Sequence, residues 1–242
     1  MRTGRTPRFH VAAGLATGAT IELPREAAHH ATRVLRLRVG ESLTLFDGTG
    51  GEYAAAIASI SRGGATVAVG EHQAHERESP LAVTLVQGIA GADRMDFIIQ
   101  KAVELGVAAI QPVLTSKSIV RLSKERGEAR LAHWQRIVIA ACEQCGRNRI
   151  PEVYPAESLA QYSAPPDAAK VMLSPQAATD LKALARTPLV LAVGPEAGFD
   201  SDEEKLLAQK GFVAARLGPR ILRTETAALA ALAALNAIRG DF

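Results

Sequence analysis

Apolar residues recur with two different periods along the chain, and the change of period divides the sequence into two parts. In the first part, short alternating runs at 42–46, 52–60 and 65–69 are interrupted by glycine turns at 47–48 and 62–64. Alternation of this kind predicts half-buried strands. A short helix is predicted over 26–36. Several short strands joined by glycine turns indicate a small β-barrel-like unit.

Beyond residue 80 the pattern alternates between apolar strands and amphipathic helices, which is typical of an α/β fold. The polar stretch 71–80 separates the two patterns, so we place a boundary between residues 74 and 75 and expect domains at 1–74 and 75–242. The predicted strands are 81–89, 109–114, 169–173, 189–193 and 213–217, and the predicted helices are 93–105, 125–145, one from about 202, and 226–238.

Two of these strands end in Gly-Pro, at Gly194-Pro195 and Gly218-Pro219. Parallel strands end at one edge of a sheet, where α/β folds bind ligands, so both loops are predicted to border one pocket. Glycine lets the backbone approach a ligand closely, and bare N–H and C=O groups can then recognise a heterocycle. The alternative is that both pairs are ordinary strand-ending turns.

The spacing of these glycines matches neither phosphate-binding pattern, GxxxxGK[ST] or GxGxxG. The helix after Gly198 begins with a capping-box pattern at Ser201 followed by acidic residues from Asp202 to Glu204. These carboxylates would repel an anion at the helix start, so the ligand is expected to be neutral or cationic there. Thr224 is predicted to cap the last helix.

Charge is distributed unevenly although the formal net charge is only +3. Residues 1–40 hold seven arginines against Glu22 and Glu26, a net of +5, so the rest of the chain carries about −2. A basic end on a near-neutral body suggests that this part of the chain binds a polyanion, and arginine is suited to bidentate phosphate contact. The alternative is a solvated arginine-rich face.

Composition bears on three further properties: membrane insertion, the role of the cysteines and metal binding. No stretch is apolar enough to span a bilayer and the N-terminus has no apolar signal core, so a cytoplasmic protein is expected. Cys142 and Cys145 lie in the apolar stripe of the helix at 125–145 and are expected to be buried and structural. The pair His29-His30 has no ligand-spaced partner, so no metal is expected.

The motifs Gly194-Pro195-Glu196-x-Gly198 and 217–227, with 33–36, 45–48, 93–96, 100–107 and 141–151, resemble the ribosomal RNA small subunit methyltransferase E family over nearly the whole chain. The resemblance implies a SPOUT-type trefoil-knotted methyltransferase domain with a small N-terminal PUA-like β-barrel domain. General topology rules disfavour knots, so the knot follows from the resemblance alone. The implied activity is S-adenosylmethionine-dependent methylation of N3 of a uridine in 16S rRNA, by a homodimer acting on the small ribosomal subunit.

The same resemblance assigns candidate site residues. Arg223 would stabilise charge on a uracil oxygen, and Glu225 would either accept the N3 proton or hold Arg223 in place. The cofactor residues would be Leu173, Ser174, Gly194, Pro195, Glu196, Gly198, Leu217, Gly218, Ile221, Leu222, Thr226 and Ala227. The RNA-binding residues would be Arg8, Arg33, Arg36, Arg94, Lys101, Gln144, Arg147 and Asn148.

The chain departs from the family pattern at three positions. Ala197 replaces a usual glycine and is predicted to keep a right-handed backbone, because alanine tolerates positive φ only at some cost. Gly91 and Ser116 stand where relatives often have a basic and an acidic residue. Three alternatives stay open: a SPOUT methyltransferase acting on tRNA or another RNA site, a non-catalytic RNA-binding ribosome-assembly protein, and a nucleotide-dependent α/β enzyme.

Overall fold

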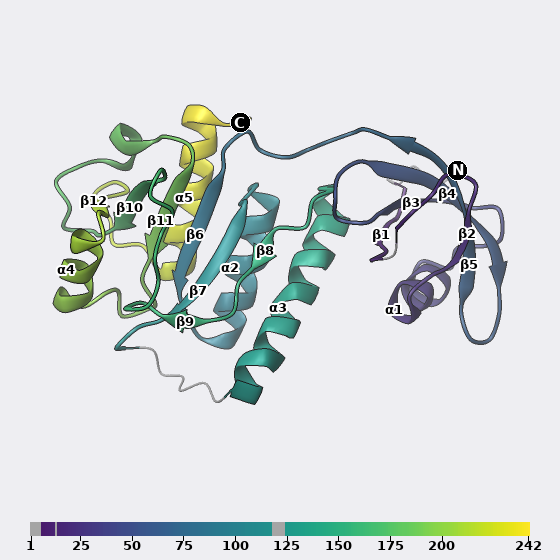
Figure 1. Ribbon diagram of the computed structural model, residues 1–242, viewed down its shortest axis with the longest axis horizontal. Helices are drawn as coiled ribbons and strands as arrows, with labels where there is room; N and C mark the ends of the chain where they lie inside the picture. The colour runs from purple at the N-terminus through teal and green to yellow at the C-terminus, as the bar shows by residue number, and fades with distance from the viewer. Residues whose placement is uncertain (1–5, 13, 118–123) are drawn as a thin grey trace. The chain divides into compact units, whose positions relative to one another are not determined.

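The computed structural model describes residues 6–12, 14–117 and 124–242, and the chain forms two compact units (Figure 1). Unit 1 consists of Met1–Glu78 and Cys142–Ile150, and unit 2 of Ser79–Ala141 and Pro151–Phe242. The segment Cys142–Ile150 therefore packs with residues more than sixty positions earlier in the chain. The domain boundary expected between residues 74 and 75 stays a prediction.

Unit 1 is built on a five-stranded sheet with the order β1-β3-β4-β5-β2. β1 pairs with β3 in parallel and the other neighbours are antiparallel. Alternate residues of the long strands, such as Ile57 and Val67, join a core with Phe9 and Leu45, as the alternating pattern predicts. The strands are β1 (Arg8–His10), β2 (Thr20–Glu22), β3 (Ser42–Phe46), β4 (Glu52–Ile60) and β5 (Ala65–Gln73).

The single helix predicted over 26–36 is wrong in its second half. An α-helix, α1 (Arg25–His29), is followed by one turn of π-helix, η1 (His30–Val34). Arg36 then takes a left-handed backbone with φ 54°, the only positive φ among the described non-glycine residues. Such a conformation is uncommon for a residue with a Cβ and persists only where the surroundings impose it.

Unit 2 contains a parallel sheet with the order β12-β10-β11-β6-β7-β8, and β9 also pairs with β7. β11 is buried along its whole length, as expected for a parallel strand covered on both faces. The strands are β6 (Val83–Gly88), β7 (Ala109–Leu114), β8 (Glu152–Val153), β9 (Glu157–Ser158), β10 (Ala169–Leu173), β11 (Leu189–Val193) and β12 (Val213–Ala215).

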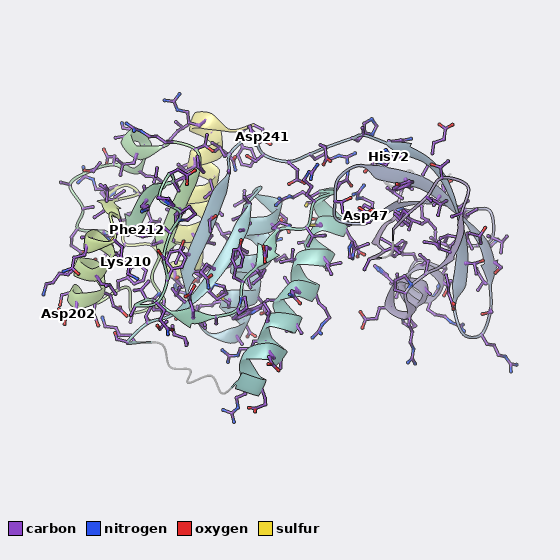
Figure 2. All side chains as sticks on the ribbon, in the orientation of Figure 1. Asp47, His72, Asp202, Lys210, Phe212 and Asp241 are labelled. Carbon is purple, nitrogen blue, oxygen red and sulfur yellow. The ribbon has the colours of Figure 1, made fainter. Side chains whose placement is uncertain are left out.

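Helices cover this sheet. α2 (Ala92–Glu104) packs against α5 (Thr224–Arg239), and α5 also contacts β6 and β11. α4 (Ser201–Gln209) contributes Leu207 to a separate core with Val86 and Val190. Phe212 follows α4 into the same core, whereas Asp202 extends to solvent (Figure 2). The remaining helices are α3 (Lys124–Cys145) and the 3₁₀ turn η2 (Leu181–Leu184).

The strand order places three loops along one edge of the sheet. β10 lies between β11 and β12, and all three strands are parallel, so their carboxyl ends point the same way. The two Gly-Pro loops therefore flank the end of β10 rather than adjoin each other directly. This edge forms the candidate site.

Candidate active site

The loops after β10, β11 and β12, with the first turns of α5, surround a pocket of about 290 Å³. That volume is at the lower end of the range for small-molecule sites. Of the twelve residues predicted to bind the cofactor, eleven line the pocket, and Thr226 instead lies exposed on α5. The lining residues that the sequence analysis did not select are Pro175, Gln176, Val193, Ala197, Phe199, Glu204, Ala215, Arg220 and Thr224.

The loop after β11 depends on its glycines. A Cβ on Gly194 would lie 2.9 Å from the Cα of Gly198 and 2.7 Å from the backbone nitrogen of Phe199, so only glycine permits this turn. Gly198 itself has φ 68°, a left-handed conformation that costs an L-residue free energy. Ala197 is not among the residues with positive φ, which agrees with the predicted backbone.

Glu196 projects from this loop toward the start of α2. Its Oε1 accepts hydrogen bonds from the backbone N–H of Gly91 at 2.9 Å and from the Arg94 guanidinium at 2.7 Å. Burial alone would raise the pKa of Glu196, but hydrogen bonds from backbone N–H groups and from Arg94 lower it below its ordinary value. Arg94, predicted to contact RNA, thus forms an ion pair at the pocket wall.

The two candidate catalytic residues lie at the beginning of α5. Arg223 occupies the exposed N-cap position, and Glu225 is in the first helical turn. The Oε2 atom of Glu225 is buried and has no hydrogen-bond partner among the described residues. The pKa of Arg94 is raised, mainly by its hydrogen bond to Glu196 and to a smaller degree by the charge of Glu225. A carboxylate oxygen without a partner is able to accept a proton.

Thr224 does not cap α5, contrary to the prediction. It occupies the first helical position, is buried, and donates its hydroxyl proton to the carbonyl oxygen of Gly194 at 2.6 Å. Its hydroxyl also accepts a hydrogen bond from the Nε2 of Gln87 at 2.9 Å. The sequence analysis missed Gln87, because the only indication of it was a polar residue at the end of a largely apolar strand.

The cap of α4 is Asp200 rather than Ser201. Asp200 accepts hydrogen bonds from the backbone N–H groups of Asp202 and Glu203, and Glu203 accepts one from the backbone N–H of Asp200, which completes a capping box. Glu203 also accepts from the N–H of Ser116 at 2.6 Å. Carboxylates thus already satisfy this helix start, which agrees with a ligand that is not a polyphosphate.

Three of the predicted RNA-binding residues, Arg8, Arg147 and Asn148, are buried in a polar network within unit 1. Arg8 forms an ion pair with Glu52 and donates to the Oδ1 of Asn148 at 2.5 Å. Glu52 also accepts from Arg77 at 3.1 Å, and Arg147 pairs with Glu78. Burial favours a structural role for these three residues.

The other predicted RNA-binding residues are more accessible. Arg33 and Arg36 are exposed on unit 1, and Gln144 is exposed near the end of α3. Lys101 pairs with Glu104 at 2.7 Å along α2. Exposed guanidinium groups fit phosphate contact better than buried ones, so the structure separates this set into two groups.

No group of three or more potential metal ligands occurs among the described residues. Cys142 is buried, and burial raises the pKa of its thiol to about 12, so it stays protonated near neutral pH. Within the part of the chain that the structure describes, none of the helices has the length and apolar character needed to cross a membrane.

Comparisons with known proteins agree with this architecture. A family model described as an RNA methyltransferase domain matches residues 77–236, and one described as an RNA methyltransferase PUA domain matches residues 23–70. Ribosomal RNA small subunit methyltransferase E from Buchnera aphidicola (strain Sg) is 34% identical, covering 98% of each chain. The protein of that name from Bacillus subtilis is 30% identical, covering 92% of this chain and 93% of its own.

Solved structures show the same likeness. Ribosomal RNA small subunit methyltransferase E from Neisseria gonorrhoeae, bound to S-adenosylmethionine, has a TM-score of 0.91 and 43% identity, covering 98% of this chain and all of its own. A putative methyltransferase from Legionella pneumophila, in complex with the same cofactor, has a TM-score of 0.94 and 39% identity, covering 99% and 100%. The resemblance predicted from the sequence motifs is confirmed: the chain belongs to the ribosomal RNA small subunit methyltransferase E family.

Proposed function

We propose that this chain transfers a methyl group from S-adenosylmethionine to N3 of a uridine in 16S rRNA, with the small ribosomal subunit as its substrate. The observation that carries the proposal is the pocket made by three strand-end loops, eleven of whose residues were selected from the sequence as cofactor-binding. Two similar solved structures are described as holding S-adenosylmethionine, which supports the choice of cofactor.

The pocket has features that fit such a cofactor. Gly194 leaves backbone atoms accessible where a Cβ would fill the space, and Gly198 and Gly218 adopt positive φ, so backbone groups can approach a heterocycle closely. The lining mixes apolar side chains such as Leu173 and Leu222 with backbone and polar groups. S-adenosylmethionine supplies an electrophilic methyl group on a sulfonium, which is cationic and compatible with the acidic start of α4.

Residues at the start of α5 are suited to the uridine. N3 must lose its proton before it attacks, so either a base or a group that stabilises the uracil anion is required. We assign the exposed Arg223 the role of stabilising negative charge on a uracil oxygen. Glu225, with its unpartnered buried Oε2, either accepts the N3 proton or orients Arg223. Alignment of N3 with the methyl donor contributes further to the rate.

The remaining assignments complete the proposal. We assign RNA binding to the domain 1–74 and methyl transfer to the domain 75–242, with a trefoil knot in the second. We expect a cytoplasmic homodimer in which α5 meets its copy. This contact rests on the family resemblance, and Ile238, near the end of α5, is 42% exposed.

The first test is a calorimetric titration with S-adenosylmethionine, S-adenosylhomocysteine and ATP. Binding of the first two without ATP supports the proposed cofactor, whereas binding of ATP alone would indicate a nucleotide-dependent enzyme. A second assay incubates the protein with unmodified 16S rRNA and with small subunits, followed by nucleoside analysis for 3-methyluridine. A different methylated nucleoside would indicate another RNA site, and cofactor binding without product on either substrate would favour a non-catalytic assembly role.

A further inference from the structure

Gln87 is a polar side chain at the carboxyl end of β6, in the middle of the sheet. Its exposed fraction is 0%, and it lies opposite Val193 of β11 and Pro112 of β7. A buried amide disfavours folding unless its hydrogen bonds are made, so its partners indicate what the residue does.

The Nε2 of Gln87 has three acceptors within hydrogen-bond distance. They are the hydroxyl of Thr224 at 2.9 Å, the carbonyl oxygen of Gly88 at 2.9 Å and the carbonyl oxygen of Gly194 at 3.3 Å. Two of these acceptors are carbonyl oxygens, which cannot donate. The amide nitrogen rather than the amide oxygen of Gln87 must therefore point toward them. The Oε1 of Gln87 has no partner among the described residues.

Thr224 connects Gln87 to Gly194 through its hydroxyl group. Its hydroxyl accepts from Gln87 and donates to the carbonyl oxygen of Gly194, so the three residues form a connected cluster, here named the Gln87 clip: Gln87, Gly194 and Thr224. Gly194 and Thr224 are thirty residues apart in sequence, and both line the pocket, one from the loop after β11 and the other from the first turn of α5.

The backbone at the end of β6 packs directly against the loop after β11, so the position of this loop depends on the Gln87 clip. A Cβ on Gly88, the residue after Gln87, would lie 2.5 Å from the Cδ of Pro195, so the end of β6 is in direct contact with the loop after β11. Because that loop already folds tightly on itself at Gly194, a shift of the Gly194 carbonyl is transmitted to the lining residues that follow it.

We propose that Gln87 is a positioning residue for the methyl donor. Without lining the pocket, it fixes the loop after β11 relative to the first turn of α5 through the Gln87 clip, and so sets the width at which the pocket accepts S-adenosylmethionine. The proposal rests on the proposed function, because it takes S-adenosylmethionine as the ligand of this pocket.

Gln111 offers a matched control on the neighbouring strand. It is also buried, in the middle of its strand β7, and its Nε2 donates to the carbonyl oxygens of Pro112 and Pro155, each at 2.9 Å. Neither proline lines the pocket. A leucine at either position keeps a similar volume and removes one buried amide.

The experiment compares Gln87→Leu and Gln111→Leu by thermal unfolding and by calorimetric titration with S-adenosylmethionine. We expect Gln87→Leu to bind about tenfold more weakly, since the loss of its hydrogen bonds to Gly194 and Thr224 loosens the loop after β11 against the first turn of α5. Gln111→Leu should bind within about twofold of the wild type although it also loses a buried amide, and the unfolding temperatures show whether each variant is folded. Equal affinity for the two variants would overturn the proposal.

A second pair decides the outcome if Gln87→Leu fails to fold. Thr224→Val removes the hydroxyl that accepts the hydrogen bond from Gln87, and we expect it to bind about tenfold more weakly. Thr224→Ser keeps this hydroxyl, and we expect nearly unchanged binding. Where Gln87→Leu does fold, its loss of affinity should not add to that of Thr224→Val in the double variant, because both changes act through one cluster. Unchanged affinity in Thr224→Val, or additive losses, would contradict the Gln87 clip. Failure of the wild type itself to bind S-adenosylmethionine would instead contradict the proposed function.

Discussion

Arg8 and Arg33 show why net charge alone did not identify the RNA-binding side chains. Both contribute to the basic N-terminal stretch, but Arg8 is only 8% exposed and pairs with Glu52, while Arg33 is exposed on the π-helical turn. The family motif around 141–151 likewise proved to contain residues of a buried network. A motif locates residues that matter, and only the fold shows whether they bind a partner or stabilise the unit.

Glu52 is central to that network, so Glu52→Gln should destabilise the protein. The change leaves Arg8 buried without its counter-ion, and breaking a buried pair in this way costs roughly 3 kcal/mol. Urea unfolding of the variant and the wild type measures the difference. Glu76→Gln is the matched control, since Glu76 pairs with Arg149 at 3.6 Å with both side chains accessible, and it should change stability by less than about 1 kcal/mol. Equal effects would mean that the network adds nothing.

The same carboxylate predicts a pH dependence. Burial alone would raise the pKa of Glu52, but hydrogen bonds and charges from Arg77 and Arg8 outweigh it and lower the pKa from 4.5 to about 2. A lowered pKa in the folded state adds stability above the unfolded value, and that stability is lost as the pH falls from about 4.5 to about 2. Unfolding measured across this window should therefore show a steeper loss for the wild type than for Glu52→Gln. If the stability of the two proteins fell equally with pH, the lowered pKa of Glu52 would be contradicted.

Arg223 and Arg220 belong to one loop but should affect different steps. Arg223 lies outside the pocket lining, whereas Arg220 is part of it. We expect Arg223→Ala to keep cofactor affinity within about threefold and to lower kcat by roughly 100-fold or more, as for the loss of one group that stabilises developing charge. Arg220→Ala should weaken cofactor binding instead. Titration and single-turnover methylation separate the two effects, and equal loss of affinity and turnover in Arg223→Ala would make it structural.

At the scale of elements, long periodic segments were predicted well and short ones were missed. β3, β4, β7, β10 and β11 have the bounds expected from their apolar patterns. The strands β1, β2, β8 and β9 contain two or three residues each, too few to show a period, and their pairing depends on distant partners. Helix starts were displaced by one or two residues, and α1, α2 and α5 begin without a side-chain cap that the sequence could have indicated.

The start of α4 gives a direct test of such a displacement. Asp200→Ala removes the acceptor for two backbone N–H groups and for the Ser116 hydroxyl, so it should lower Tm by about 2–4 °C. Ser201→Ala, at the position that the sequence suggested, should lower Tm by less than about 1 °C. Calorimetry of both variants measures this, and the reverse order would show that Ser201 is the cap.

For the whole molecule, the pocket could be predicted because its parts are strand ends of a parallel sheet, and these meet at one edge whatever the loops contain. The hydrogen bonds that support the pocket could not be predicted. Gln87 is a polar residue in a largely apolar strand, and its role follows only from its contacts with Gly194 and Thr224, which are distant in sequence. Unit 1 posed the same difficulty, since Cys142–Ile150 joins it from far along the chain. Contacts between segments distant in sequence leave no periodic signal.

The uneven charge of the whole molecule predicts how RNA binding depends on salt. Each phosphate contact that is lost reduces the slope of log K against log salt by about 0.7–0.9. Because Arg33 and Arg36 are exposed on unit 1, Arg33→Ala combined with Arg36→Ala should weaken binding to 16S rRNA and reduce the slope by about 1.4–1.8. The variant with Lys182→Ala and Arg186→Ala removes the same charge from exposed positions of unit 2 and should leave the slope unchanged. Filter binding between 50 and 200 mM salt, the range over which such contacts are commonly resolved, measures both slopes. If both variants flatten the slope equally, RNA senses total charge rather than a surface of unit 1, and the assignment of RNA binding to the domain 1–74 would be wrong.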